Sequence, residues 1–159
     1  FAALFSIVLT RIANRLGRKL TYSLSLLAGG IGYISFLFFQ NAEIVHVNLF
    51  VTQVDVPRGA LNLLIPMLGI GIAWAAILAM PYAILSSSLP ADKTGVYMGI
   101  FNFTIAAPQI VSGLVAGQIL KYVFDNQAIY IIVLAGVCMI LGAMSVYFVQ
   151  DNNDAEAKA

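Results

Sequence analysis

Charge is the scarcest property of this sequence. Only 9% of its 159 residues are Asp, Glu, Lys or Arg, while 61% are hydrophobic and the mean hydropathy is +0.94. An ordinary soluble domain has about 25% charged residues, because polar groups must cover a surface that faces water. The composition therefore excludes a soluble globular protein. It predicts that most of the protein surface faces the lipid bilayer. The net charge of +1 gives no reason to expect nucleic acid as a partner.

Residues that bind metals or carry out acid–base chemistry are also few. The single cysteine, Cys138, excludes an internal disulfide and a thiolate metal cage, and His46 is the only histidine. The long apolar runs described next contain no paired carboxylates and no histidine. We therefore expect no metal site, no cofactor and no catalytic residues, and an integral membrane enzyme is the less favoured class of function.

Four long apolar runs make up most of the chain. They cover residues 20–39, 61–88, 96–120 and 128–149, and none of them contains Asp, Glu, Lys, Arg or His. About 20 helical residues cross a hydrocarbon layer of ~30 Å, so each run predicts a complete transmembrane helix. Residues 1–10 are apolar but cover about half a crossing, which predicts a partial span. The expected fold is an all-α integral membrane protein with one partial and four complete transmembrane helices.

A short basic segment separates the partial span from the first complete one. Residues 11–19, RIANRLGRK, hold four of the eight basic side chains in the sequence, and we call this segment the hinge. Because Lys and Arg in short loops stay on the cytoplasmic side, we expect the hinge to be cytoplasmic. Each complete span crosses the membrane, so the following loops alternate between the two sides. Residues 89–95 and the tail 150–159 are then cytoplasmic, and residues 40–60 and 121–127 lie outside. We expect a multi-pass protein of the cell membrane with a cytoplasmic C-terminus.

The hinge resembles the loop motif of the major facilitator superfamily, whose pattern is G-x-L-A-D-R-x-G-R-K. The residues that match the motif are Ala13, Arg15, Gly17, Arg18 and Lys19. Ile12 replaces the motif's Leu, Thr10 its first Gly, and Asn14 its Asp. That family has twelve helices in two six-helix halves. The resemblance implies that residues 1–149 are part of the C-terminal half, and that the N-terminal half of the same chain is a partner absent from this sequence.

Residues 80–113 are similar to the disaccharide–proton symporters within that superfamily, the bacterial maltose or sucrose carriers akin to plant sucrose transporters. The likeness lies in a PYA triplet, a K-x-G-V-Y-M-G loop and an F-N-F…P-Q-I helix. It implies a secondary carrier that moves a disaccharide with protons by alternating access. Since the predicted spans hold no titratable carboxylate or histidine, the proton site is expected outside this sequence. A non-transporting helical scaffold or subunit is the alternative that the same hydropathy permits.

Three side chains are candidates for binding the sugar. Trp74 lies near the middle of its span among small residues, although Trp usually prefers the membrane interface. On the next span, Asn102 and Gln109 share a small, polar helical face with Gly113 and Gly117. A sugar ring stacked on the indole, with its hydroxyls held by the two amides, would use all three. The alternatives are core packing for Trp74, interhelical hydrogen bonds for the amides, and a helix–helix contact for the glycines.

Three residues within the spans are candidates for conformational roles. Pro81 and Pro108 each remove one backbone hydrogen bond, which marks either a bending point or a static kink that improves packing. Tyr82 lies eight residues from Trp74, about 12 Å along a helix, so we predict a gate rather than a second wall of the sugar site.

The hinge is predicted to act mechanically as well as to set the topology. Arg15, Arg18 and Lys19 can reach lipid phosphates, each contributing up to about 1 kcal/mol, or pair with acidic groups at cytoplasmic helix ends and hold the inner gate shut. Asn14 cannot supply the carboxylate of the family motif, so the latch is expected to be weaker than in the full motif. Gly17, a motif glycine, belongs to the same conformational group.

Overall fold

The computed structural model describes residues 2–39, 44–49, 52–87, 89–90 and 93–149. The helices are α1 (Ala2–Leu16), α2 (Arg18–Ser35), α3 (Arg58–Asn62), α4 (Leu64–Ser87), α5 (Thr94–Tyr122) and α6 (Ala128–Ser145), with 3-10 turns η1 (Phe36–Phe38) and η3 (Val146–Phe148). Strands β1 (Ile44–Leu49) and β2 (Thr52–Pro57) form an antiparallel pair in which Leu49 lies opposite Thr52. The predicted tail, residues 150–159, lies outside the described residues.

Four helical stretches are long and apolar enough to cross a membrane. They are Arg18–Phe38, Gly59–Ser86, Thr94–Tyr122 and Ala128–Phe148. Helix α1 precedes them, where the sequence predicts a partial span. The predicted all-α membrane fold class is confirmed, and the hairpin of β1 and β2 adds two short strands between the first two of these stretches.

The break between α3 and α4 follows from a proline. Pro66 has no N–H, so it cannot donate the helical hydrogen bond to the carbonyl of Asn62. The bonds on either side of it are made: the Leu63 N–H donates to the Gly59 carbonyl at 3.0 Å and the Met67 N–H to the Leu63 carbonyl at 3.2 Å. The chain therefore continues with one turn residue, Leu63, between the two helices.

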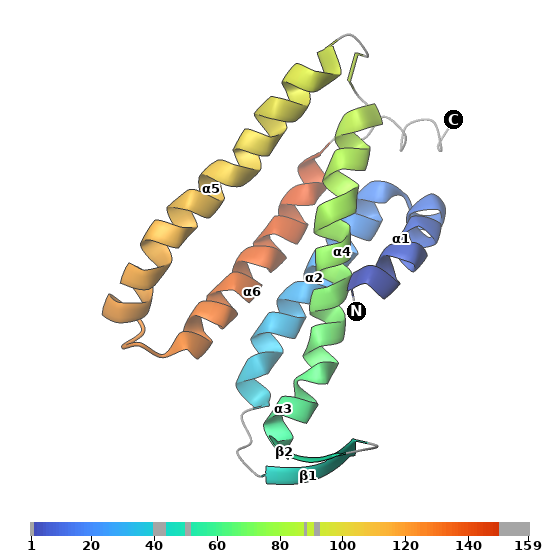
Figure 1. The fold of residues 1–159 in the computed structure, drawn as a ribbon. Helices are drawn as coiled ribbons and strands as arrows, with labels where there is room; N and C mark the ends of the chain where they lie inside the picture. The colour runs from blue at the N-terminus through green and yellow to red at the C-terminus, as the bar shows by residue number, and fades with distance from the viewer. Residues whose placement is uncertain (1, 40–43, 50–51, 88, 91–92, 150–159) are drawn as a thin grey trace.

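Helix α2 forms the centre of the helical layer. It packs against α4 on one side and α6 on the other, and α1 lies against α4 and α2 (Figure 1). Helix α5 lies at the far edge of the layer, where it touches α6 (Figure 1). No residue of α5 is buried.

Glycines allow α2 to approach both neighbours with its backbone. A Cβ added to Gly30 would lie 2.8 Å from the carbonyl oxygen of Gly136 on α6. A Cβ added to Gly69 on α4 would lie 2.5 Å from the carbonyl oxygen of Ala28 on α2. Main chain therefore meets main chain on both faces of α2, as in the small-residue interfaces of membrane helices.

The glycine pair on α5 is different. A Cβ at Gly113 or Gly117 would meet nothing within 4 Å in the described part of the chain. The described helices therefore do not use this pair as the helix–helix contact that the spacing suggested. The spacing indicates only that the two glycines share a face, and that face has no neighbour here.

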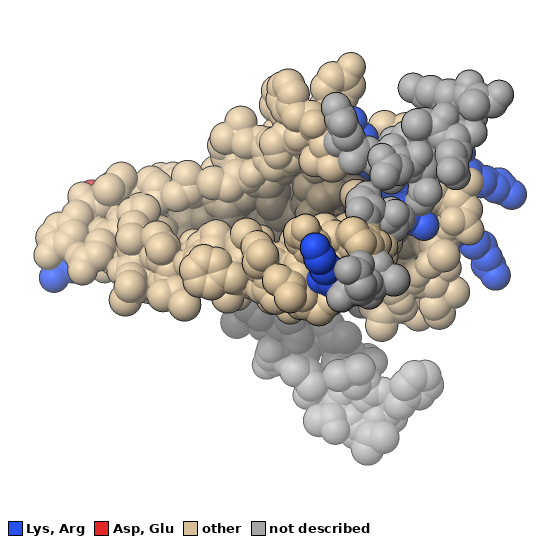
Figure 2. Space-filling view, turned by 90° about the horizontal axis from the view of Figure 1, so that it is seen from above, with Lys and Arg blue, Asp and Glu red and all other residues tan. Residues whose placement is uncertain are grey.

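The outer surface is largely uncharged. Residues without charge cover most of the described surface in the view from above, and Lys and Arg gather mainly to one side (Figure 2). Large apolar side chains point outward on α5, for example Phe103, 70% exposed, and Leu114, 74% exposed. Such a surface is suited to hydrocarbon rather than to water, in agreement with the four membrane-crossing stretches.

Candidate functional site

The break between α1 and α2, within the hinge, is a single residue. Helix α1 continues to Leu16 and α2 begins at Arg18, so Gly17 alone separates them. Gly17 has φ 86°, a backbone conformation that glycine adopts without the steric cost a Cβ would bring. The expected partial span of residues 1–10 thus extends by helical structure into the hinge, because Arg and Asn at the end of an apolar helix do not stop it; the glycine does.

Two hinge cations reach the ends of other helices. The Arg18 guanidinium donates from Nη1 to the carbonyl oxygen of Ala83, near the end of α4, at 3.0 Å in a partly buried position. The Lys19 ammonium lies 5.2 Å from the centre of the Tyr147 ring in η3, which follows α6. The hinge therefore joins the start of α2 to the ends of α4 and α6. We call this the hinge end of the layer.

Among the described residues, the partners of these two cations are not carboxylates. Arg18 binds a backbone carbonyl and Lys19 an aromatic face. Carbonyls at a helix C-terminus carry the negative end of the helix dipole, so they attract a cation without a carboxylate. Asn14 and Arg15 are exposed, and no hydrogen bond from either is present among the described side chains.

Trp74 lies on a face of α4 that the other described helices leave exposed, and we call it the open face of α4. Its side chain is 50% exposed, whereas its neighbours Ala73 and Ala75 are 0% and 4% exposed. Ala75 belongs to a cluster with Leu9 and Ala13 of α1, so the alanines face the packed helices. In the described part of the chain the indole is therefore not enclosed by neighbouring helices.

Asn102 of α5 has a hydrogen-bond partner on another helix. The Tyr82 hydroxyl of α4 donates to its Oδ1 at 2.7 Å. The Tyr82 ring also meets Phe101 edge to face, with ring centres 5.1 Å apart and planes at 79°. The structure thus brings together a predicted gate residue and a predicted substrate-binding residue.

The remaining predicted residues are not drawn into that contact. Gln109 is exposed on α5, about two turns beyond Asn102. Among the described residues, no hydrogen bond joins Gln109 or Asn102 to Trp74. Pro81 and Pro108 lie inside α4 and α5, and each helix continues through its proline.

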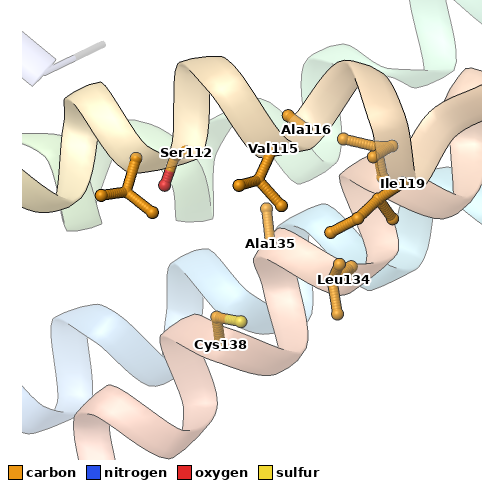
Figure 3. Close-up of a pocket in the computed structure, with 9 residues that line it drawn as sticks. Ser112, Val115, Ala116, Ile119, Leu134, Ala135 and Cys138 are labelled. Carbon is orange, nitrogen blue, oxygen red and sulfur yellow. The ribbon is translucent and has the colours of Figure 1, made fainter.

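A groove between α5 and α6 was not anticipated. It has a volume of about 450 Å³ and is lined by apolar side chains such as Val115, Ile119 and Leu134, with the Ser112 hydroxyl and the Cys138 thiol as its polar groups (Figure 3). Cys138 is exposed. A groove with so few hydrogen-bonding groups does not suit a polyhydroxylated solute.

Sequence reasoning did not identify the partners of Arg18 and Tyr82. The partners of Arg18 and Tyr82 are 65 and 20 residues away along the chain. A carbonyl partner has no signal in the residue type, because every residue carries one. The Tyr82–Asn102 pair had a usable signal, since both are polar residues in apolar spans and such groups tend to find each other.

Comparison with known families identifies one relationship. The family model described as Major Facilitator Superfamily matches residues 1–159. The comparison with curated proteins gives no match, and the comparison with solved structures gives none.

Proposed function

The chain belongs to the major facilitator superfamily, a family of membrane transporters, and we propose that it forms part of a secondary carrier that moves a disaccharide with protons. Alternating access would expose the sugar site to each side of the membrane in turn. The observation that supports this proposal is the half-exposed Trp74 on α4, combined with two amide side chains on the open helix α5. Apolar spans rarely carry such groups without a polar ligand or partner.

Each proposed site residue has a chemical role. The Trp74 ring would stack on the apolar face of a sugar ring, and Asn102 and Gln109 would exchange hydrogen bonds with sugar hydroxyls. The described spans contain no carboxylate or histidine that could carry the coupled proton. We therefore place the proton site in the N-terminal half or in other helices of the full-length carrier.

Uptake by the full-length carrier tests this function. Proteoliposomes should accumulate radiolabelled sucrose or maltose when a proton gradient is imposed, and a protonophore should abolish the accumulation. Absence of uptake and of binding for both sugars, in folded protein, would favour a non-transporting scaffold instead. Uptake that persists with the protonophore would support a sugar carrier but contradict its coupling to protons.

The proposed orientation places the hinge end of the layer in the cytoplasm. Single cysteines replacing Asn14 and Lys93, both exposed, should then react with an impermeant maleimide only from the cytoplasmic side. A cysteine replacing Asn48, in β1, should react from outside. A Cys138→Ala background is needed because that thiol is exposed. Labelling of the Asn14→Cys variant from outside would reverse the orientation.

The hinge is proposed to help close the inner gate through Arg18. We expect Arg18→Ala in the full-length carrier to slow uptake about tenfold, the scale of losing one charge-assisted hydrogen bond of about 1.5 kcal/mol. Equilibrium sugar affinity should stay within a few fold, since Arg18 lies at the hinge end and not on the open face of α4.

Arg15→Ala is the matched control for that experiment. It removes the same charge from the hinge, but Arg15 is exposed and makes no hydrogen bond among the described side chains. We expect it to slow uptake less than Arg18→Ala does. Normal uptake by the Arg18→Ala protein at a normal protein level would reduce the hinge to a topology signal.

A further inference from the structure

The contact between Tyr82 and Asn102 links a helix of the packed layer to a helix with no buried residue. The hydroxyl of Tyr82 donates to Asn102 Oδ1 at 2.7 Å, and the ring rests against Phe101. Both contacts hold α5 to α4 at a level between Trp74 and the hinge end. Tyr82 and Asn102 are both exposed, so the contact is accessible from outside the described helices.

A tyrosine hydroxyl offers Asn102 the same interaction as a sugar hydroxyl. Each is an O–H on carbon that donates to an amide oxygen at about 2.7 Å. The Tyr82 ring also rests against Phe101, which helps to hold its hydroxyl beside that oxygen. A solute hydroxyl that takes the same position on Asn102 Oδ1 must therefore replace the Tyr82 hydroxyl.

We propose that Tyr82 and the transported solute compete for Asn102, so that solute binding releases α5 from α4. This inference rests on the sugar-binding role proposed for Asn102. A ligand shifts a conformational equilibrium only when it binds one state better than the other, and competition for one amide oxygen supplies that difference. Tyr82 is thereby a self-ligand that keeps the site occupied when no solute is present.

The backbone next to Tyr82 is suited to such a release. Pro81 directly precedes it inside α4 and has no N–H to donate to the carbonyl of Ile77. The turn of α4 that ends at Pro81, next to Tyr82, therefore has one backbone hydrogen bond fewer than a regular helix. On the far side of Tyr82, Arg18 anchors the Ala83 carbonyl, so the end of α4 stays tied to the hinge while the tyrosine exchanges partners.

Sugar titration of purified full-length variants tests the competition. Tyr82→Phe removes the competing hydroxyl and keeps the ring against Phe101. We expect it to raise the affinity for sucrose or maltose about two- to tenfold, the equivalent of one neutral hydrogen bond. Asn102→Ala should lower the affinity, and adding Tyr82→Phe to Asn102→Ala should change nothing further.

Tyr97→Phe is the matched control. Tyr97 lies on α5 and is 42% exposed, close to the 37% of Tyr82, and it makes no hydrogen bond among the described side chains. We expect no change in affinity for this variant, and a melting temperature measured for every variant confirms that it is folded.

The outcomes separate this inference from the proposed function. If Tyr82→Phe leaves the affinity unchanged or lowers it while Asn102→Ala weakens binding, the competition is wrong and the sugar role of Asn102 stands. If Asn102→Ala binds sugar normally in both the parent and the Tyr82→Phe background, Asn102 is no sugar ligand, and both proposals for this residue fail.

Discussion

Replacing Gly69 with alanine is expected to lower the free energy of unfolding of the full-length carrier by about 1–3 kcal/mol, seen as a lower melting temperature. The added Cβ would lie 2.5 Å from the carbonyl oxygen of Ala28 and 3.2 Å from its carbonyl carbon. Both atoms belong to the backbone of α2, which cannot move aside as the tip of a flexible side chain can. Overpacking of this kind costs about 1–3 kcal/mol, because neither backbone can give way without distortion.

Gly117→Ala provides the comparison for Gly69→Ala. It makes the same chemical change in another transmembrane helix, at a position where the Cβ meets nothing within 4 Å in the described part of the chain. We expect a melting temperature within about 1 °C of the parent, because an isolated exposed methyl group alters little. Equal stability of the two variants would show that α2 and α4 are not in backbone contact at Gly69.

Replacing Trp74 with alanine is expected to weaken sugar affinity about 5- to 150-fold. The indole is 50% exposed on the open face of α4, and stacking on such a ring contributes roughly 1–3 kcal/mol by analogy with bases on aromatic side chains. Trp74→Phe should keep part of the affinity because a flat ring remains. Affinity is to be measured by titration of purified full-length protein with sucrose and maltose.

Phe103→Ala controls for the loss of an exposed aromatic ring. Phe103 is 70% exposed on α5 and has no proposed role in binding, so its removal should leave sugar affinity unchanged. Melting temperatures measured in parallel distinguish binding from packing. A Trp74→Ala protein that is destabilised but binds sugar normally would assign the indole to packing and remove it from the site.

The helices were predictable from the sequence because lipid leaves few alternatives. In hydrocarbon every backbone polar group must be satisfied within the segment, so an uncharged run of 20 or more residues becomes a helix. The four membrane-crossing stretches accordingly begin and end within two residues of the predicted runs. The end of helix α1 was not predictable in this way. The helix continues beyond the apolar residues 1–10, through Arg11 and Arg15, to Leu16.

Contacts between helices were harder to predict than the helices. Gly113 and Gly117 have the spacing of a helix contact, yet the close approach occurs at Gly30, Gly69 and Gly136. Periodicity identifies residues on a common face, but the neighbour of that face depends on the arrangement of the whole layer. For the same reason the sequence left two roles open for Asn102, contact with a solute or an interhelical hydrogen bond, and could not name Tyr82 as its partner.

The backbone contacts on both faces of α2 have a mechanical consequence. Because main-chain atoms of α2 touch α4 near Gly69 and α6 near Gly136, a sliding displacement of either neighbour would collide with peptide groups after a fraction of a helical turn. The three helices should therefore turn together as one rigid body. Any relative motion within this part of the carrier would then be left to the joint at Gly17, the end of α4 beyond Pro81, and α5 at the open edge.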